Sequence, residues 1–333
     1  MRQVGTGGGA RPARGTYAPP MRFGAAIWTN RTTWPALRDV AGRIEASGFD
    51  SLWADDHLLA DEGDWSDPKL EGWMTLSAWA ALTSHVRLGL LVGANTFRNP
   101  GLTAKLATTL DHVSDGRAIL GLGGGWFERE HDAFGFDFGA SFGERLDRLD
   151  EAVGLIRRLL DGERVTHEGR FYTLRDAVCA PRPIQARLPI LIGGSGPRKT
   201  LLTTAHYADL WNGYGEPARI ADRDAILRAH CAAIGRDERE IARTVSIDVV
   251  IRDHAEEALR TYGEIAERHG LAGRVGSDGQ AQDLTLWGPP ATIAAGIRAY
   301  ADVGVSEVIW IFRDPFDLET IERLPEVRAA LDA

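Results

Sequence analysis

The 333-residue sequence has few cysteines, no long apolar run and no excess of positive charge. Its two cysteines, Cys179 and Cys231, lie far apart without metal-ligand spacing, so we expect buried thiols in a reducing compartment, the cytoplasm. No apolar stretch approaches the roughly 18 residues that a membrane span requires. The net charge of −9 and the pI near 5.5 disfavour binding to nucleic acid or to an anionic membrane. The overall composition, 44% hydrophobic and 26% charged residues, is typical of a globular enzyme.

The N-terminal segment lacks the apolar core of a secretory signal. Residues 1–20 hold five glycines, three prolines and three arginines, a composition that predicts a disordered leader. We therefore expect a single folded domain over residues 21–333. Met21, which directly precedes the first expected strand, is an alternative to Met1 as the natural start of the protein.

From residue 21 onward, short apolar segments alternate with segments of helical periodicity. The expected helices begin near Trp34, Trp73, Pro100, Phe142, Pro197, Ala221, Glu257 and Thr292, and a final helix ends the chain. The expected strands are residues 22–28, 51–54, 86–92, 118–123, 188–192, 209–212, 245–251 and 307–312. Eight strands that alternate with helices predict an α/β fold, a (β/α)8 TIM barrel. A doubly wound open sheet is the alternative, but no G-x-G-x-x-G motif follows the first strand.

Two segments interrupt the alternation. Residues 162–187 include a predicted small hairpin at 165–172 and two later prolines, which indicates an insertion rather than a linker. Residues 271–290 form a second irregular stretch.

Two glycine-rich loops follow predicted strands, about 70 residues apart. The first contains Gly123, Gly124 and Gly125, and the second contains Gly193, Gly194, Ser195 and Gly196. A single such loop is compatible with a tight turn, but two of them at one end of a parallel sheet favour two parts of one ligand site. Pro197 is expected at the first position of the following helix, with Arg198 and Lys199 just inside. Free backbone N–H groups and two cations there predict a phosphate site.

The second predicted strand ends in Asp55, Asp56 and His57. A histidine at the carboxyl end of a barrel strand is placed to exchange protons with a bound substrate, although a lone loop histidine is usually only solvated. The acidic residues that follow, Asp61, Glu62, Asp64 and Asp67, match no EF-hand or His-x-x-x-His pattern. We therefore predict no metal site.

Several motifs in order along the chain carry a resemblance to a known family. They are residues 48–58 (GFDSLWADDHL), 87–89 (RLG), 95–100 (NTFRNP), 107–111 (ATTLD), 120–127 (LGLGGGWF), 189–194 (PILIGG) and 207–212 (YADLWN). With them the chain resembles the bacterial luciferase-like family of flavin and deazaflavin oxidoreductases, and within it the branch that depends on coenzyme F420.

The resemblance implies a set of cofactor-binding residues at the carboxyl end of the barrel. They are Asp56, Leu91, Val92, Asn95, Gly123, Gly124, Gly125, Gly193, Gly194, Ser195 and Gly196. It also implies a non-prolyl cis peptide at Leu91–Val92, behind the deazaflavin ring. His57 corresponds to the family's proton donor or acceptor.

The function implied is hydride transfer between reduced F420 and a small organic substrate at a C=C, C=N or C=O bond. An FMN-dependent monooxygenase that uses dioxygen is the alternative, and a binding or sensor protein without turnover is a further one. Trp126 stands where relatives that oxidise sugar phosphates carry glutamate, so we expect a different substrate, apolar or aromatic. Trp28, Trp73, Trp126 and Trp287 are candidates for its pocket or for core packing. The family also suggests a homodimer.

Overall fold

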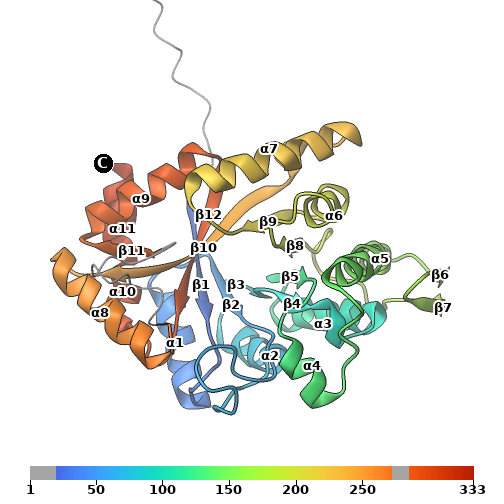
Figure 1. Ribbon diagram of the computed structural model, residues 1–333, viewed down its shortest axis with the longest axis horizontal. Coiled ribbons are helices and arrows are strands. Elements are labelled where there is room, and N and C mark those ends of the chain that lie inside the picture. Colours follow the sequence, from blue (N-terminus) through green and yellow to red (C-terminus); the bar gives the residue numbers. More distant parts are fainter. Residues whose placement is uncertain (1–19, 272–284) are drawn as a thin grey trace, which may run out of the picture.

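The computed structural model describes residues 20–271 and 285–333, which form a closed barrel of parallel strands surrounded by helices (Figure 1). The barrel strands are β1 (Arg22–Ile27), β2 (Ser51–Ala54), β3 (Arg87–Leu90), β5 (Ala118–Gly123), β8 (Ile190–Gly193), β9 (Leu210–Gly213), β10 (Ala242–Ile251) and β12 (Val305–Phe312). Apart from Pro20, the predicted leader lies outside the described residues.

The strand order closes the barrel. Starting from β1, the neighbours are β2, β3, β5, β8, β9, β10 and β12, and β12 pairs again with β1. Every one of these pairings is parallel. The (β/α)8 barrel predicted from the sequence is therefore confirmed.

The remaining strands lie beside the barrel. β4 (Gly93–Ala94) pairs with the end of β5, and β11 (Thr285–Gly288) pairs with β10. β6 (Val165–Glu168) and β7 (Thr173–Ala177) form a separate antiparallel hairpin, away from the barrel in Figure 1. The hairpin prediction for residues 165–172 is thus right in kind but too short, since its second strand begins after Tyr172.

The helices cover the outside of the barrel. They are α1 (Trp34–Ala46), α2 (Gly72–Leu82), α3 (Pro100–Val113), α4 (Glu128–Phe134), α5 (Phe142–Leu160), α6 (Thr200–Tyr207), α7 (Pro217–Ala233), α8 (Ala255–Arg268), α9 (Pro290–Asp302), α10 (Leu318–Glu322) and α11 (Leu324–Asp332). Ser141 caps α5 by accepting the Glu144 N–H at 3.1 Å, as its Ser-x-x-Glu pattern predicts. Within the described ranges, no helix is long and apolar enough to cross a bilayer.

A tryptophan fills the inside of the barrel. Trp53 is fully buried and packs with Ile119, Leu191 and Ile309 in an interior cluster, separate from the larger core between strands and helices. A Cβ at Gly89 would lie 2.7 Å from the Trp53 ring, so a neighbouring strand needs glycine there. The packed interior leaves the carboxyl ends of the strands as the place for a ligand.

Several elements differ from the sequence prediction. α7 begins at Pro217 rather than near Ala221, and the predicted final helix is two helices, α10 and α11. The helix α4 has no counterpart among the predicted helices, because it spans only seven residues. The predicted irregular stretch 271–290 contains β11 and the first residue of α9, and residues 272–284 of it lie outside the described part. α6 begins at Thr200 rather than at Pro197.

Candidate active site

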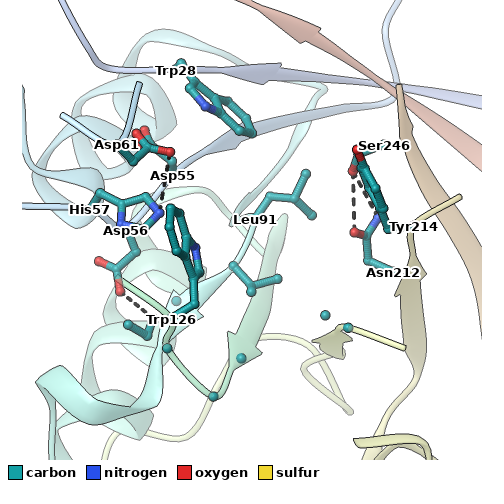
Figure 2. Close-up of a pocket in the computed structure, with 18 of the residues that line it drawn as sticks. Trp28, Asp55, Asp56, His57, Asp61, Leu91, Trp126, Asn212, Tyr214 and Ser246 are labelled. Carbon is teal, nitrogen blue, oxygen red and sulfur yellow. Dashed lines mark hydrogen bonds and ion pairs between the residues drawn. The ribbon is translucent and has the colours of Figure 1, made fainter. Parts of the chain in front are cut away.

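A cavity of about 430 Å³ opens at the carboxyl ends of the barrel strands. Figure 2 shows its walls, with His57 and Trp126 on one side and Asn212, Tyr214 and Ser246 on the other. Nine of the twelve predicted site residues line it, namely Asp56, His57, Leu91, Val92, Gly123, Gly124, Gly125, Gly193 and Gly194.

Leu91 lies between the two sides of the cavity (Figure 2). The peptide bond that joins it to Val92 is cis, as the resemblance implies. The Val92 side chain fits between the two glycine loops. A Cβ at Gly123 would come within 2.7 Å of Val92 Cγ2, and one at Gly193 within 2.8 Å of Val92 Cγ1. Both glycines are therefore needed for backbone packing around Val92.

Three predicted residues do not line the cavity: Asn95, Ser195 and Gly196. Asn95 is buried, and its Nδ2 donates to the Tyr172 hydroxyl at 3.0 Å, which ties the loop after β4 to the hairpin insertion. The Ser195 Oγ is buried and has no hydrogen-bond partner among the described residues.

The phosphate site predicted at the second glycine loop stays a prediction, but two of the features on which it was based differ in the structure. Because α6 begins at Thr200, Pro197 is not its first residue, and Arg198 and Lys199 precede the helix. The Lys199 ammonium also donates to the Gly143 carbonyl at 2.9 Å and pairs with Asp147 on α5. Lys199 therefore holds α5 against this loop, and its charge already has a partner.

His57 is held by two carboxylates. Its Nδ1 lies 2.9 Å from Glu130 Oε1, and its Nε2 lies 3.7 Å from Asp61 Oδ2. The other oxygen of Glu130 accepts the Leu58 N–H at 2.8 Å. An ionised carboxylate is an acceptor only, so the Nδ1–H group of His57 donates the hydrogen bond to Glu130.

The first glycine loop positions Glu130. Gly125 has a φ of +75°, and a Cβ there would meet Thr96 Oγ1 at 2.8 Å, so this turn requires glycine. The chain then enters α4, whose third residue, Glu130, is only 1% exposed and lies against His57. Trp126 and Phe127, which lead into the helix, pack edge-on against the His57 ring.

The surroundings of His57 raise its pKa above the ordinary value. Burial has the largest single effect and lowers the pKa, but the hydrogen bond with Glu130 and the charges of Asp61 and Asp55 together outweigh it. The protonated imidazolium is thus stabilised by the carboxylates around it.

Asp56 forms a two-pronged ion pair with Arg98. The guanidinium donates to both carboxylate oxygens, at 2.6 and 2.8 Å, and the Ala94 N–H donates to Oδ2 at 2.8 Å. Glu71 is a second partner of Arg98, at 3.2 Å. Asp56 therefore joins the end of β2 to the loop before α3, in addition to lining the cavity.

Two of the four candidate tryptophans line the cavity, Trp28 and Trp126. Trp73 is buried away from it, and Trp287 packs against the cluster of Val250, Ala258 and Tyr262. Trp73 and Trp287 thus serve packing.

Several residues that line the cavity were not predicted from the sequence. Asn212 and Arg313 could have been predicted, because they stand at the ends of β9 and β12 and ligands of such barrels lie at the carboxyl ends of the strands. The same applies to Tyr214, just after β9. Glu130 carried a weaker signal, since only the unexpected helix α4 turns it toward His57.

Comparison with known proteins gives the family. Residues 14–307 match the model of the luciferase-like monooxygenase family. The chain is 31% identical, over 324 residues, to the F420-dependent glucose-6-phosphate dehydrogenase of Kineococcus radiotolerans, which covers 89% of this chain and 92% of that protein.

Solved structures agree on the fold. An F420-dependent secondary alcohol dehydrogenase superposes with a TM-score of 0.81 over 94% of this chain and 99% of that one, at 20% identity. Long-chain alkane monooxygenase gives 0.79 over 95% and 92%, at 16% identity. The family model over residues 14–307 and the relative at 31% identity show that the chain belongs to the luciferase-like monooxygenase family.

Proposed function

We propose that the protein is an F420-dependent oxidoreductase that acts on a small organic substrate, with His57 as proton donor or acceptor. The observation that carries the proposal is that Glu130 fixes the orientation of the His57 imidazole in the cavity wall. Glu130 fixes its Nδ1 at 2.9 Å, and the ring lines a cavity bounded by both glycine loops. The 31% identity to an F420-dependent dehydrogenase across 89% of the chain supports the same cofactor.

The residues of the cavity fit a flat cofactor with an anionic tail. Leu91 and Val92 offer an apolar surface for a ring system, and Gly124 and Gly194 expose backbone at the side of the cavity where a tail would run. Ser195 lies in the second glycine loop next to the lining residue Gly194, and its Oγ is buried without a partner in the described part of the chain, so we propose it as a hydroxyl for a phosphate oxygen of the tail. Coenzyme F420, when bound, supplies or accepts a hydride at its deazaflavin ring.

The protein's own contribution is to hold and move a proton at His57. Since Nδ1 donates to Glu130, the exchangeable proton is the one on Nε2. The raised pKa keeps more of the imidazole protonated near neutral pH than in an ordinary histidine. The ring is therefore suited to donate a proton while a C=C, C=N or C=O bond is reduced, and to accept one in the reverse direction.

The substrate we propose is apolar or aromatic. Trp28 and Trp126 line the cavity. Trp126 stands where the resemblance places a glutamate in relatives that oxidise sugar phosphates. An FMN-dependent monooxygenase is the rival function, to which the likeness to long-chain alkane monooxygenase adds only the shared fold.

The assembly and the compartment are proposals of the same kind. The family suggests a homodimer, which sedimentation equilibrium tests. Cys179 and Cys231 are both buried free thiols, which fits a reducing compartment, and we place the protein in the cytoplasm.

The test replaces His57 by alanine. We expect the His57→Ala variant to bind F420 like the wild type but to lose turnover by about 10²- to 10⁴-fold, the usual effect of removing a general acid or base. His85→Ala is the matched control, because the His85 side chain is 86% exposed. Turnover near the wild-type rate in His57→Ala would refute the role of His57.

A further inference from the structure

A second histidine, His131, lies next to Glu130 in α4 and has no part in the proton transfer described above. Its side chain is completely buried. The ring packs against three phenyl rings, with 4.6 to 6.4 Å between ring centres: Phe97, Phe136 and Phe138. A polar ring in such an aromatic cage is stable only where its nitrogens are hydrogen-bonded.

Both ring nitrogens of His131 have a partner. Nδ1 lies 2.8 Å from the Phe127 carbonyl oxygen, and Nε2 lies 2.7 Å from the Thr96 hydroxyl. Because a carbonyl oxygen only accepts, the Nδ1–H group donates to Phe127. A hydroxyl is able to donate, so Nε2 of the neutral ring accepts from Thr96. The two partners together fix the tautomer and the orientation of the ring.

These two hydrogen bonds join three segments at the cavity. Thr96 belongs to the 3-10 helix η1 (Asn95–Phe97), and Phe127 lies between the first glycine loop and α4. A Cβ at Gly125 would lie 2.8 Å from Thr96 Oγ1 and 3.8 Å from His131 Nε2, so the turn of the loop packs directly against this pair. His131 therefore ties the glycine loop and α4 to η1.

The carbonyl that His131 holds belongs to a residue that also contacts the active-site imidazole. The Phe127 ring packs edge-on against His57, with 5.9 Å between ring centres. Among the described residues, no side chain caps α4 at Phe127, and Glu130 in its first turn contacts Nδ1 of His57. A shift of this turn would therefore displace both the aromatic ring and the carboxylate that hold His57.

We propose that His131 is a positioning residue: through the Phe127 carbonyl it holds the first turn of α4, so that Glu130 stays against the imidazole of the active site. The inference rests on the proposed function, because it concerns the histidine to which that function assigns the proton transfer. It gives the buried imidazole of His131 a role beyond filling its aromatic cage.

The test follows the titration of His57 by NMR, which requires neither substrate nor turnover. The resonance of His57 is identified by its loss in His57→Ala. In His131→Phe a ring still fills the cage but donates nothing to the Phe127 carbonyl. Glu130 should then hold the imidazole less closely, and the midpoint of the His57 titration should fall. An unchanged midpoint would overturn the proposal.

The control for this titration is a histidine outside the site. His85 is 86% exposed, so His85→Phe should leave the midpoint of His57 unchanged. The charged groups that act on His57 are present in both variants: Asp55, Asp61 and Glu130. A fall of the midpoint in His131→Phe alone therefore reports a change in how these groups are placed.

Two further variants separate positioning from packing. If the effect of His131 runs through Glu130, then His131→Phe should shift the midpoint little further in a Glu130→Gln background. An equal shift in both backgrounds contradicts the proposal. His131→Asn keeps an N–H group for the Phe127 carbonyl but leaves part of the cage empty, so its midpoint should stay near the wild type although its stability in urea falls. A midpoint that follows the loss of stability instead would make His131 a packing residue only.

Turnover and the wild-type spectrum complete the test. We expect kcat of His131→Phe to fall by roughly tenfold with little change in KM, because the proton donor is displaced rather than removed. Should the variants misfold, the nitrogen-15 shifts of wild-type His131 decide, since the proposal requires a proton on Nδ1 and none on Nε2. Undiminished turnover in His57→Ala, with the midpoint of His57 still falling in His131→Phe, would refute the proposed function and leave the positioning contact standing.

Discussion

Glu130 Oε1 lies 2.9 Å from Nδ1 of His57, although the two residues are 73 positions apart in the chain. His57 follows β2, whereas Glu130 belongs to the short helix α4 after the first glycine loop. The contact joins the first glycine loop to His57, because the turn at Gly125 brings a buried carboxylate to Nδ1 of the imidazole. If His57 exchanges protons as proposed, Glu130 orients it for that role.

Replacement of Glu130 by glutamine tests this role. Glu130→Gln keeps the shape but removes the charge that orients and stabilises the imidazolium, so we expect kcat to fall by roughly 10- to 100-fold. Binding of F420 should change little. Glu128→Gln is the control, because Glu128 lies exposed on the same helix. An equal loss of kcat in both variants would point to a disturbed helix instead.

The raised pKa of His57 predicts a pH dependence. In the reducing direction the protonated form is active, so the rate should be full at low pH and fall as the pH rises through the pKa of His57. For the wild type this fall should occur above the ordinary histidine value of 6.5. Glu130→Gln should move it to lower pH, because one of the groups that raise the pKa is gone. A profile that does not shift would contradict the assignment.

The Asp56–Arg98 pair predicts a loss of stability. Arg98→Ala leaves the buried Asp56 carboxylate without its main partner, which should lower the free energy of unfolding by roughly 3 kcal/mol in urea denaturation. The double variant with Asp56→Ala should recover part of the loss, since the uncompensated charge is removed as well. Arg239→Ala, at an 82% exposed side chain, should change stability by less than about 0.5 kcal/mol. No difference between Arg98→Ala and Arg239→Ala would argue against the pair.

Because Trp53 packs against Gly89 inside the barrel, replacing Gly89 by alanine should cause a steric clash, whereas the same change at Gly42 on α1 should not. A Cβ at Gly89 would lie 2.6 Å from the Ile119 carbonyl oxygen and 2.7 Å from Trp53, so Gly89→Ala should destabilise the fold by at least about 2 kcal/mol. A Cβ at Gly42, on α1, would meet no atom within 4 Å, so Gly42→Ala should stabilise the helix by about 0.5–1 kcal/mol. Thermal or urea unfolding of both variants checks the pair, and destabilisation by Gly42→Ala would be the unexpected result.

The barrel was predictable from the sequence because each strand is a short apolar run between helices of clear periodicity. Ser141 and Glu144 marked the start of α5, and Ser51 to Ala54 marked β2 without error. The same regularity placed His57 and both glycine loops at one end of the barrel. The rule that ligands lie at strand ends then located most of the cavity.

The contacts among side chains were not predictable in this way. The apolar pattern around Glu130 is too short to predict α4, and nothing local shows that Arg98 reaches Asp56. The position of Lys199 after the glycines favours a phosphate ligand, but its partner Asp147 lies on another helix. Such pairs depend on the packing of distant elements, which sequence spacing does not describe.

The central claim is that this cavity holds coenzyme F420. The most direct test is whether F420 stabilises the folded protein against urea. The purified protein is unfolded in urea alone, with F420 and with FMN, each at matched concentrations. A ligand present at 100 times its Kd adds about 2.7 kcal/mol to the free energy of unfolding. We predict such a stabilisation by F420 and little by FMN. Stabilisation by FMN with none by F420 would contradict the account.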